Sequence, residues 1–181
     1  MRVAISGAHA TGKSTLAADL ARELPHHAIV DELYYAMLAE GYDFPAEPTA
    51  EDFEAMLERS LAVLHDTPSR DVIFDRGPVD YLGYLAALKP RDVEALGDRI
   101  ARTAGAIDSL DLIVFVPIER PDRIDVPASE GRRLRHRVDA ILRDILIEDA
   151  WGLGTRVLEV SGSPDNRVRQ VLSHAQHLET R

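Results

Sequence analysis

The sequence predicts an α/β fold in which a five-stranded parallel sheet carries helices on both faces. Five short apolar runs alternate with segments of helical periodicity along the chain. Each run is continuously apolar rather than alternating, which is typical of strands that are buried on both faces of a parallel sheet. The 181 residues contain no Gly/Ser-rich linker and no internal repeat, so we expect a single domain over residues 1–181.

The strands and helices follow from the spacing of the apolar residues and from their stop signals. The expected strands, the second of them buried like the others, are Arg2–Ser6, Ala28–Val30, Val72–Phe74, Leu112–Val116 and Arg156–Val160. The expected helices are Lys13–Leu24, Leu33–Ala39, Thr49–Leu64, Val79–Leu88, Val93–Ile107, a segment from Leu134 to Ile145, and Asp165–Leu178. Thr49 and Asp52 resemble a capping pair at the start of the third helix.

The composition excludes several classes of protein. A net charge of −10 argues against non-specific binding to nucleic acid. The apolar runs are too short to cross a bilayer, so no membrane association is expected. The absence of cysteine rules out disulfides and cysteine-based metal sites and fits a reducing cytoplasm. Nothing in the sequence assigns an oligomeric state.

One motif carries the first functional prediction. The pattern G-x-x-x-x-G-K-S/T of a phosphate-binding loop (Walker A motif) is matched at every fixed position by Gly7, Ala8, His9, Ala10, Thr11, Gly12, Lys13 and Ser14. Glycines let the backbone curl so that its N–H groups face phosphate oxygens, and the following helix adds its positive end. Lys13 is expected on the β- and γ-phosphates and Ser14 on Mg²⁺, while Thr15 follows as a helix residue at the edge of the nucleotide-binding segment. The sequence therefore predicts a P-loop NTPase fold.

Two other strand ends carry polar pairs suited to phosphate chemistry. Asp31 and Glu32 follow the second strand, and Asp75 and Arg76 follow the third. Ligands of open parallel sheets bind at the carboxyl ends of the strands. Asp75 is a candidate for holding Mg²⁺ through water, and Arg76 for binding a phosphoryl oxygen or the acceptor. The alternatives are a helix cap for the first pair and a surface ion pair for the second.

Missing motifs narrow the type of P-loop protein. The chain has no Asn-Lys-x-Asp guanine motif, and its only glutamines, Gln170 and Gln176, lie in the last predicted helix. The third strand ends in Asp75 and Arg76 rather than in the adjacent Asp-Glu pair of motor-type ATPases. These absences favour phosphoryl transfer to a bound acceptor over hydrolysis.

The stretch from Asp75 to Tyr81 resembles the Asp/Glu-Arg-Gly/Ser signature of nucleoside kinases and the Asp-Arg-Gly-x-x-Asp stretch of ribosylnicotinamide kinase domains. The second-strand carboxylates match in position a carboxylate of deoxynucleoside and thymidylate kinases, although Leu33 stands where proline is usual. The chain thus resembles AAA-family ATPases of the nucleoside and nucleotide kinase type. The resemblance implies that Glu32 or Asp31 is the general base, with Glu32 favoured.

The same resemblance implies a lid over residues 117–134 that supplies arginines to the phosphates. Of the arginines clustered there, Arg132 and Arg133 lie at the loop-to-helix junction and are the chosen catalytic candidates. A solvated charged face is the alternative. Aromatic residues between Tyr34 and Phe53 are expected either to stack on a base or to pack in the core.

We therefore expect an ATP- and Mg²⁺-dependent kinase, a phosphotransferase acting on a small hydroxyl-bearing acceptor, with a nucleoside or nucleoside-like molecule first. A kinase of another small metabolite or of an antibiotic is the alternative within the class. A nucleotide-binding regulatory ATPase that signals to a partner is the alternative outside it.

Overall fold

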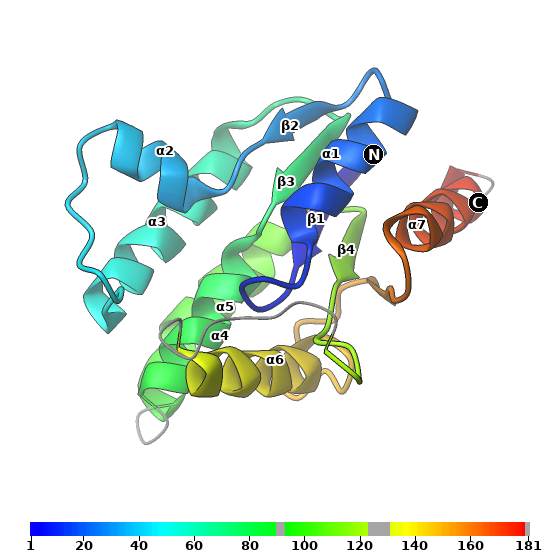
Figure 1. Ribbon diagram of the computed structural model, residues 1–181. Helices are drawn as coiled ribbons and strands as arrows, with labels where there is room; N and C mark the ends of the chain where they lie inside the picture. Colours follow the sequence, from blue (N-terminus) through cyan, green and yellow to red (C-terminus); the bar gives the residue numbers. More distant parts are fainter. Residues whose placement is uncertain (90–92, 123–130, 180–181) are drawn as a thin grey trace.

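The computed structural model describes residues 1–89, 93–122 and 131–179 and contains the expected sheet (Figure 1). All strands are parallel and occur in the order β2-β3-β1-β4-β5. They are β1 (Arg2–Ser6), β2 (Ala28–Val30), β3 (Val72–Asp75), β4 (Leu112–Phe115) and β5 (Val157–Glu159). The register sets Ile5 of β1 beside Asp75 of β3 and Val114 of β4, so the loops that follow these strands leave the same edge of the sheet.

Helices cover both faces of the sheet. On one face lie α1 (Lys13–Glu23) and α7 (Pro164–Glu179), where Leu16 and Val171 pack with Val3 and Ile5 of β1. The other face carries α3 (Ala50–Asp66), α4 (Pro78–Leu88), α5 (Gly97–Ile107) and α6 (Arg132–Leu146). Ala4, between Val3 and Ile5, belongs to this second core. Both sides of the strands are thus buried, as their continuously apolar sequences predict.

Three local features test the expectations at finer detail. The capping pair is confirmed, because the Thr49 hydroxyl accepts from the Asp52 N–H and the Asp52 carboxylate accepts from the Thr49 N–H at 2.7 Å. The expected helix Val93–Ile107 is instead a 3-10 turn, η1 (Val93–Leu96), followed by α5, which starts at a glycine with poor helix propensity. The expectation that Ala28–Val30 is buried is wrong, since β2 is the edge strand and Ile29 is 40% exposed.

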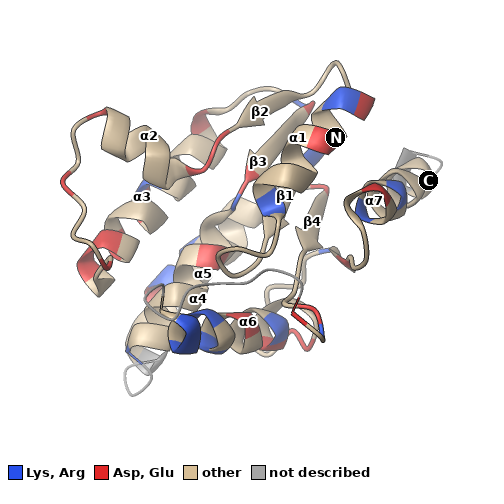
Figure 2. Cartoon of the chain, in the orientation of Figure 1, with Lys and Arg blue, Asp and Glu red and all other residues tan. Residues whose placement is uncertain are grey.

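The remaining elements frame the carboxyl edge of the sheet. The short helix α2 (Leu33–Ala39) leads from β2 towards α3 (Figure 1). The basic side chains concentrate on α6, where Figure 2 shows successive blue segments. The lid expected at 117–134 includes residues 123–130, which lie outside the described residues. Within the described ranges, no helix has both the length and the apolar character that spanning a membrane requires.

Candidate functional site: a phosphate loop beside an aromatic cavity

The phosphate loop connects β1 to α1, and its conformation depends on glycine at two points. Gly7 has φ +156°, and a Cβ added there would lie 2.4 Å from the backbone oxygen of Val116. Gly12 precedes α1 with φ +89°, in the left-handed region that glycine adopts without strain. Ala10, between them, is also left-handed, with φ +51°. The chain therefore curls tightly between the strand and the helix.

The loop holds its carbonyl oxygens against cationic side chains. Five successive carbonyls accept a hydrogen bond from lysine or arginine: Gly7 from Arg76 Nη1 at 2.9 Å, Ala8 from Lys13 Nζ at 2.6 Å, His9 from Arg135 Nε at 2.9 Å, Ala10 from Arg135 Nη2 at 3.0 Å, and Thr11 from Arg167 Nη1 at 2.7 Å. Among the described residues, none accepts a hydrogen bond from the N–H groups of Ala10, Thr11 and Gly12. Unpaired N–H groups before a helix are the donors that bind phosphate oxygens.

Two of these arginines connect the loop to the segment that follows β4. Arg135 is 1% exposed and forms an ion pair with Asp122. Arg167 pairs with Glu119 at 3.0 Å, and Glu119 also accepts from the Gly162 N–H at 2.5 Å. The backbone of the loop is thus fixed by α6, α7 and the start of the predicted lid.

A buried aspartate, Asp80, holds the start of the phosphate loop by a hydrogen bond. Asp80 lies in the first turn of α4 and is completely buried. Its carboxylate accepts from the Gly7 N–H at 2.8 Å and from the Gly77 N–H at 3.1 Å. Burial raises the pKa of Asp80, while the charges of Arg76 and Lys13 and the two backbone donors act in the opposite direction. Asp80 therefore joins the phosphate loop to the turn after β3.

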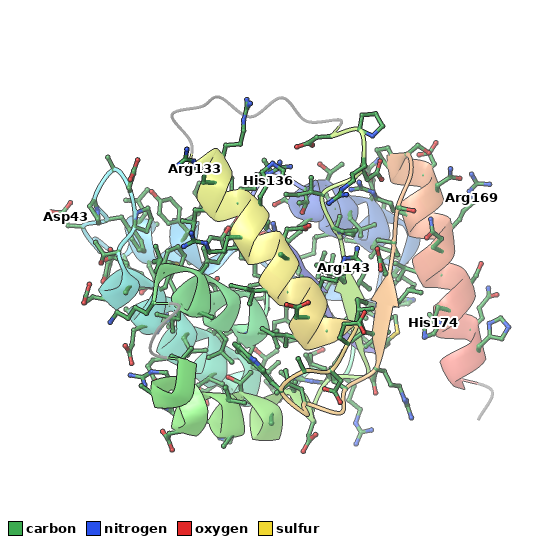
Figure 3. The ribbon with its side chains drawn as sticks, turned by 90° about the horizontal axis from the view of Figure 1, so that it is seen from below. Asp43, Arg133, His136, Arg143, Arg169 and His174 are labelled. Carbon is green, nitrogen blue, oxygen red and sulfur yellow. The ribbon has the colours of Figure 1, made fainter. Side chains whose placement is uncertain are left out.

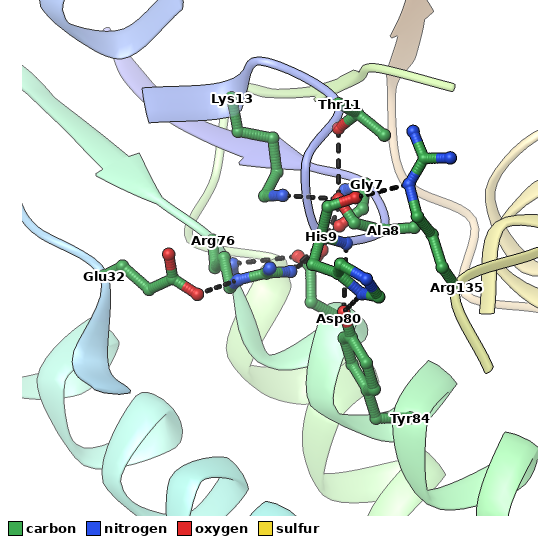
Figure 4. A network of polar contacts seen from close by, with 11 residues as sticks. Gly7, Ala8, His9, Thr11, Lys13, Glu32, Arg76, Asp80, Tyr84 and Arg135 are labelled. Carbon is green, nitrogen blue, oxygen red and sulfur yellow. Dashed lines mark hydrogen bonds and ion pairs between the residues drawn. The ribbon is translucent and has the colours of Figure 1, made fainter. Parts of the chain in front are cut away.

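Arg76 is the centre of the network in Figure 4. It is 8% exposed, has φ +81°, and places its guanidinium between the Gly7 carbonyl, Asp80 and Glu32. The Nε donates to Glu32 Oε1 at 2.5 Å. A left-handed arginine is strained, and such residues persist where the surrounding contacts over-determine them. The burial of Arg76 and its partners show that the alternative of a surface pair with Asp75 is wrong.

Glu32 and Asp31 differ in their surroundings. Burial alone would raise the pKa of the Glu32 carboxyl, but the charges of Arg76 and Lys13 outweigh burial and lower the pKa. Glu32 occupies the N-cap position of α2, yet its side chain makes no capping hydrogen bond. Asp31 is exposed. Of the two acids, Glu32 is the one that the fold directs to the phosphate loop.

Asp75 and Ser14 fit the requirements of a magnesium site. Asp75 is 7% exposed, and its Oδ1 is buried without a hydrogen-bond partner among the described residues. Burial raises the pKa of Asp75, and a hydrogen bond with Ser14 acts in the opposite direction. A hydroxyl next to an unsatisfied carboxylate is a donor set that Mg²⁺ accepts together with water and phosphate oxygens. These are the two residues that the sequence assigns to the metal.

Lys13 is buried, and its ammonium group lies at the loop. Burial and the nearby Arg76 charge lower the pKa of Lys13 to about 7, although Asp80, Glu32 and Asp75 raise it. In this state the ammonium donates to the Ala8 carbonyl. A phosphate group would supply the negative charge that this buried cation requires.

A cavity of about 590 Å³ adjoins the loop. Its polar wall includes Glu32 and Arg76, and its apolar wall includes Tyr34, Phe53 and Tyr84. Phe53 and Tyr84 stack with ring centroids 4.4 Å apart. Two of the aromatic residues expected between Tyr34 and Phe53 therefore line a cavity next to the phosphate loop, while Tyr35 is 64% exposed.

The structure places the other candidates less centrally. Arg132 and Arg133 are exposed in the first turn of α6, and Figure 3 shows Arg133 near the start of that helix. Their catalytic role stays a prediction. Arg135 contacts the loop instead, and the sequence carries a signal for it, because Arg135, Val138 and Leu142 share one helical face. An arginine on an apolar face must bury its charge and find partners there.

Sequence reasoning did not assign Tyr84, Glu119 and Arg167 to the site, and it included Asp80 only as the last residue of the Asp-Arg-Gly-x-x-Asp stretch, without a role. Asp80 has a readable signal: proline at the first helical position with an acid two residues later indicates a capped helix start. The other three lie in segments without a motif. Their roles come only from contacts between elements that are distant in sequence.

Comparison with solved structures identifies similar folds. The chain is similar to the structure of deoxyadenosine kinase from M. mycoides with products bound, at a TM-score of 0.71 and 14% identity, covering 98% of this chain and 100% of that one. It is similar to NadR protein in complex with NR, at a TM-score of 0.69 and 21% identity, covering 97% of this chain and 50% of that one. It also resembles shikimate kinase from Aquifex aeolicus, at a TM-score of 0.57 and 19% identity, covering 98% of this chain and 97% of that one.

These likenesses confirm the predicted fold class, a P-loop fold of the nucleoside and nucleotide kinase type. No curated protein matches the sequence significantly. A family model described as AAA domain matches residues 2–167, which include the phosphate loop, both acidic strand ends and Arg135. The chain therefore belongs to this AAA domain family of P-loop proteins.

Proposed function

We propose that the protein is an ATP- and Mg²⁺-dependent phosphotransferase whose acceptor is a small hydroxyl-bearing molecule. The observation that carries this proposal is the 590 Å³ cavity beside the phosphate loop, with Glu32 in its wall. A P-loop protein that only hydrolyses ATP needs no such cavity. Its volume lies within the range of about 300–1,000 Å³ that is typical of small-ligand sites.

The geometry supports a direct transfer from ATP to the acceptor. The loop N–H groups and Lys13 bind the β- and γ-phosphates, and Arg76 lies between the loop and the cavity. The acceptor hydroxyl attacks the γ-phosphorus while its proton passes to the Glu32 carboxylate, and the bond to ADP breaks. Mg²⁺ would be held by the Ser14 hydroxyl and, through water, by Asp75, and it would neutralise charge on the β- and γ-phosphate oxygens.

The charges of the cavity favour an uncharged acceptor. Its described lining holds Glu32, Glu47 and one arginine, Arg76. Arg76 is already paired with Glu32 and Asp80. A phosphorylated or carboxylated acceptor would find carboxylates in the wall and no unpaired lysine or arginine among the described lining residues. The aromatic wall supports a planar ring, so a nucleoside or nucleoside-like molecule comes first.

Two alternatives make different demands on the site. A kinase of another small metabolite or of an antibiotic would use the same residues with a different acceptor. A regulatory ATPase would release ADP in response to a partner protein rather than to a small molecule. The aromatic cavity favours the first of these alternatives over the second.

The test is an ADP-release assay with Mg-ATP over nucleosides, nucleotides and vitamins. We expect an acceptor from the uncharged set to stimulate release. Glu32→Gln should then lower acceptor-dependent kcat by about 10² to 10⁴-fold with nearly unchanged ATP binding, because a general base acts on the acceptor. Asp31→Asn is the matched control and should retain activity, since Asp31 is exposed. If both variants retain activity, neither Glu32 nor Asp31 is the general base. If only a protein partner stimulates ADP release, the regulatory ATPase is favoured.

A further inference from the structure

His9 occupies a variable position of the phosphate-loop motif, so the motif does not require histidine there. Of the variable loop positions, Ala8 is completely buried and the Thr11 hydroxyl donates to the Ala8 carbonyl at 3.1 Å. Of the described residues that line the aromatic cavity, His9 is the one that comes from the phosphate loop. The loop that cradles phosphates thus also contributes an imidazole to the cavity.

The backbone of His9 is held on both sides. Its N–H donates to the Tyr84 hydroxyl at 3.0 Å, and its carbonyl accepts from Arg135 Nε at 2.9 Å. The Tyr84 hydroxyl also lies 3.4 Å from Nδ1 of the imidazole, as Figure 4 shows. Tyr84 therefore contacts both the backbone and the ring of His9. Helix α4 thus contributes a contact to the imidazole through Tyr84.

His9 lies at the junction of the phosphate loop and the aromatic cavity. The loop carries the N–H groups suited to phosphates, and the wall of the adjoining cavity carries Glu32 and the Phe53–Tyr84 stack. A side chain at this junction is placed to contact a molecule that binds in the cavity beside the loop. Imidazole can donate or accept a hydrogen bond, which suits a hydroxyl-bearing molecule.

We propose that the His9 imidazole contacts the acceptor and orients its hydroxyl towards the γ-phosphate, and that Tyr84 positions this imidazole. The inference rests on the proposed function, because it requires an acceptor in the cavity. It separates two roles of one loop. The backbone and Lys13 bind ATP, whereas the side chain of His9 selects and orients the acceptor.

The first experiment measures His9→Ala with the acceptor that the ADP-release screen identifies. We expect kcat/KM for that acceptor to fall at least about tenfold, because a contact to the acceptor is lost. The affinity for Mg-AMP-PNP, measured by calorimetry, should stay within about threefold, because the loop contacts ATP through its backbone and Lys13. His174→Ala, on the outer helix α7 in Figure 3, is the matched histidine control and should behave as wild type.

The second experiment is a double-mutant cycle with Tyr84→Phe, which removes one hydroxyl. In the wild-type background this change should weaken both acceptor use and ATP binding, because the hydroxyl contacts the ring and the N–H of His9. In the His9→Ala background the effect on the acceptor should disappear and the effect on ATP binding should persist. This split separates positioning of the imidazole from general support of the loop.

The outcomes distinguish the inference from the function on which it rests. An active wild type and an equally active His9→Ala variant overturn the inference alone. The same holds if the variant loses AMP-PNP affinity and acceptor use in equal proportion, since His9 would then serve only the loop. A screen in which no small molecule stimulates the wild type refutes the proposed function and the inference with it.

Discussion

Arg135 offers the sharpest test of how the phosphate loop is held in place. Its guanidinium donates to the carbonyls of His9 and Ala10 and pairs with Asp122, and its side chain is 1% exposed. Arg143, eight residues further along α6, pairs with Glu159 through two hydrogen bonds of 2.6 and 3.0 Å. The side chains of that second pair are 41% and 36% exposed. The two arginines share a helix and a bidentate pairing but differ in burial.

Replacement of each arginine by methionine keeps much of the side-chain volume and removes the charge. Breaking a buried ion pair costs about 3–5 kcal/mol of unfolding free energy. Because the Asp122 side chain is 33% exposed and regains water, we expect about 2–4 kcal/mol for Arg135→Met. An exposed pair contributes about 0–1 kcal/mol, which sets the expectation for Arg143→Met. For a chain of this size, each kcal/mol lowers Tm by about 2–4 °C.

The assay is thermal unfolding of both variants, followed by calorimetry with Mg-AMP-PNP. Arg135→Met should melt about 5–15 °C below wild type and bind the nucleotide more weakly, because two loop carbonyls lose their donor. Arg143→Met should lower Tm by at most about 4 °C and leave nucleotide affinity unchanged. Equal losses of Tm in the two variants would refute the reasoning from burial, and unchanged nucleotide affinity in Arg135→Met would show that the loop keeps its shape without this clamp.

Three further predictions concern the loop and its neighbours. Lys13→Ala should abolish catalysis and weaken triphosphate binding in calorimetry, because the charge on the β- and γ-phosphates is lost; full affinity and turnover would contradict the phosphate-loop assignment. Gly7→Ala should destabilise the fold by several kcal/mol in denaturant titration, because the new Cβ would lie 2.4 Å from the Val116 carbonyl oxygen. Gly105→Ala, in helix α5, is the control and should stabilise the fold by about 0.5–1 kcal/mol, because its Cβ would meet nothing within 4 Å. The folded pKa of Glu32 lies below its usual 4.5, so its carboxylate stabilises the fold above that pH and the contribution is lost as pH falls through the folded pKa. The difference in Tm between wild type and Glu32→Gln should therefore be constant above about pH 5.5 and shrink in more acidic buffer; a constant difference down to pH 3 would contradict the pKa direction.

Most of the fold could be predicted from the sequence because its signals are local. A strand buried on both faces must be continuously apolar, and Leu112–Phe115 needs no knowledge of its neighbours to be recognised. The burial of Ala28–Val30 could not be predicted in the same way, because an edge strand and a central strand of three residues have the same apolar pattern. Only the order of strands in the sheet separates them.

The same distinction between local signals and long-range contacts applies to the candidate site. The fixed positions of the phosphate loop are a local motif and were readable, as were the acids at the two strand ends. The resemblance favoured Glu32 over Asp31, whereas the ion pair of Glu32 with Arg76, 44 residues away in the chain, is a long-range contact that no local motif shows. Arg135 and Arg167 lie still further from the loop that they contact. The resemblance to kinases led to the choice of Arg132 and Arg133 at the start of the helix. The structure instead has Arg135 on the buried face of α6, in contact with the loop.

The clamping of the loop also makes the proposed binding of a triphosphate compatible with the acidity of the protein. The net charge is −10, yet the five loop carbonyls face Lys13, Arg76, Arg135 and Arg167. Three of these cations also pair with a carboxylate, namely Glu32, Asp122 and Glu119. The pairs contribute little net charge, but together with Lys13 they hold the five loop carbonyls, while the N–H groups of Ala10, Thr11 and Gly12 have no acceptor among the described residues and are left for phosphate oxygens. Binding of the anion then depends on preorganised backbone dipoles and on one buried lysine, and the overall charge of the protein has little influence on it.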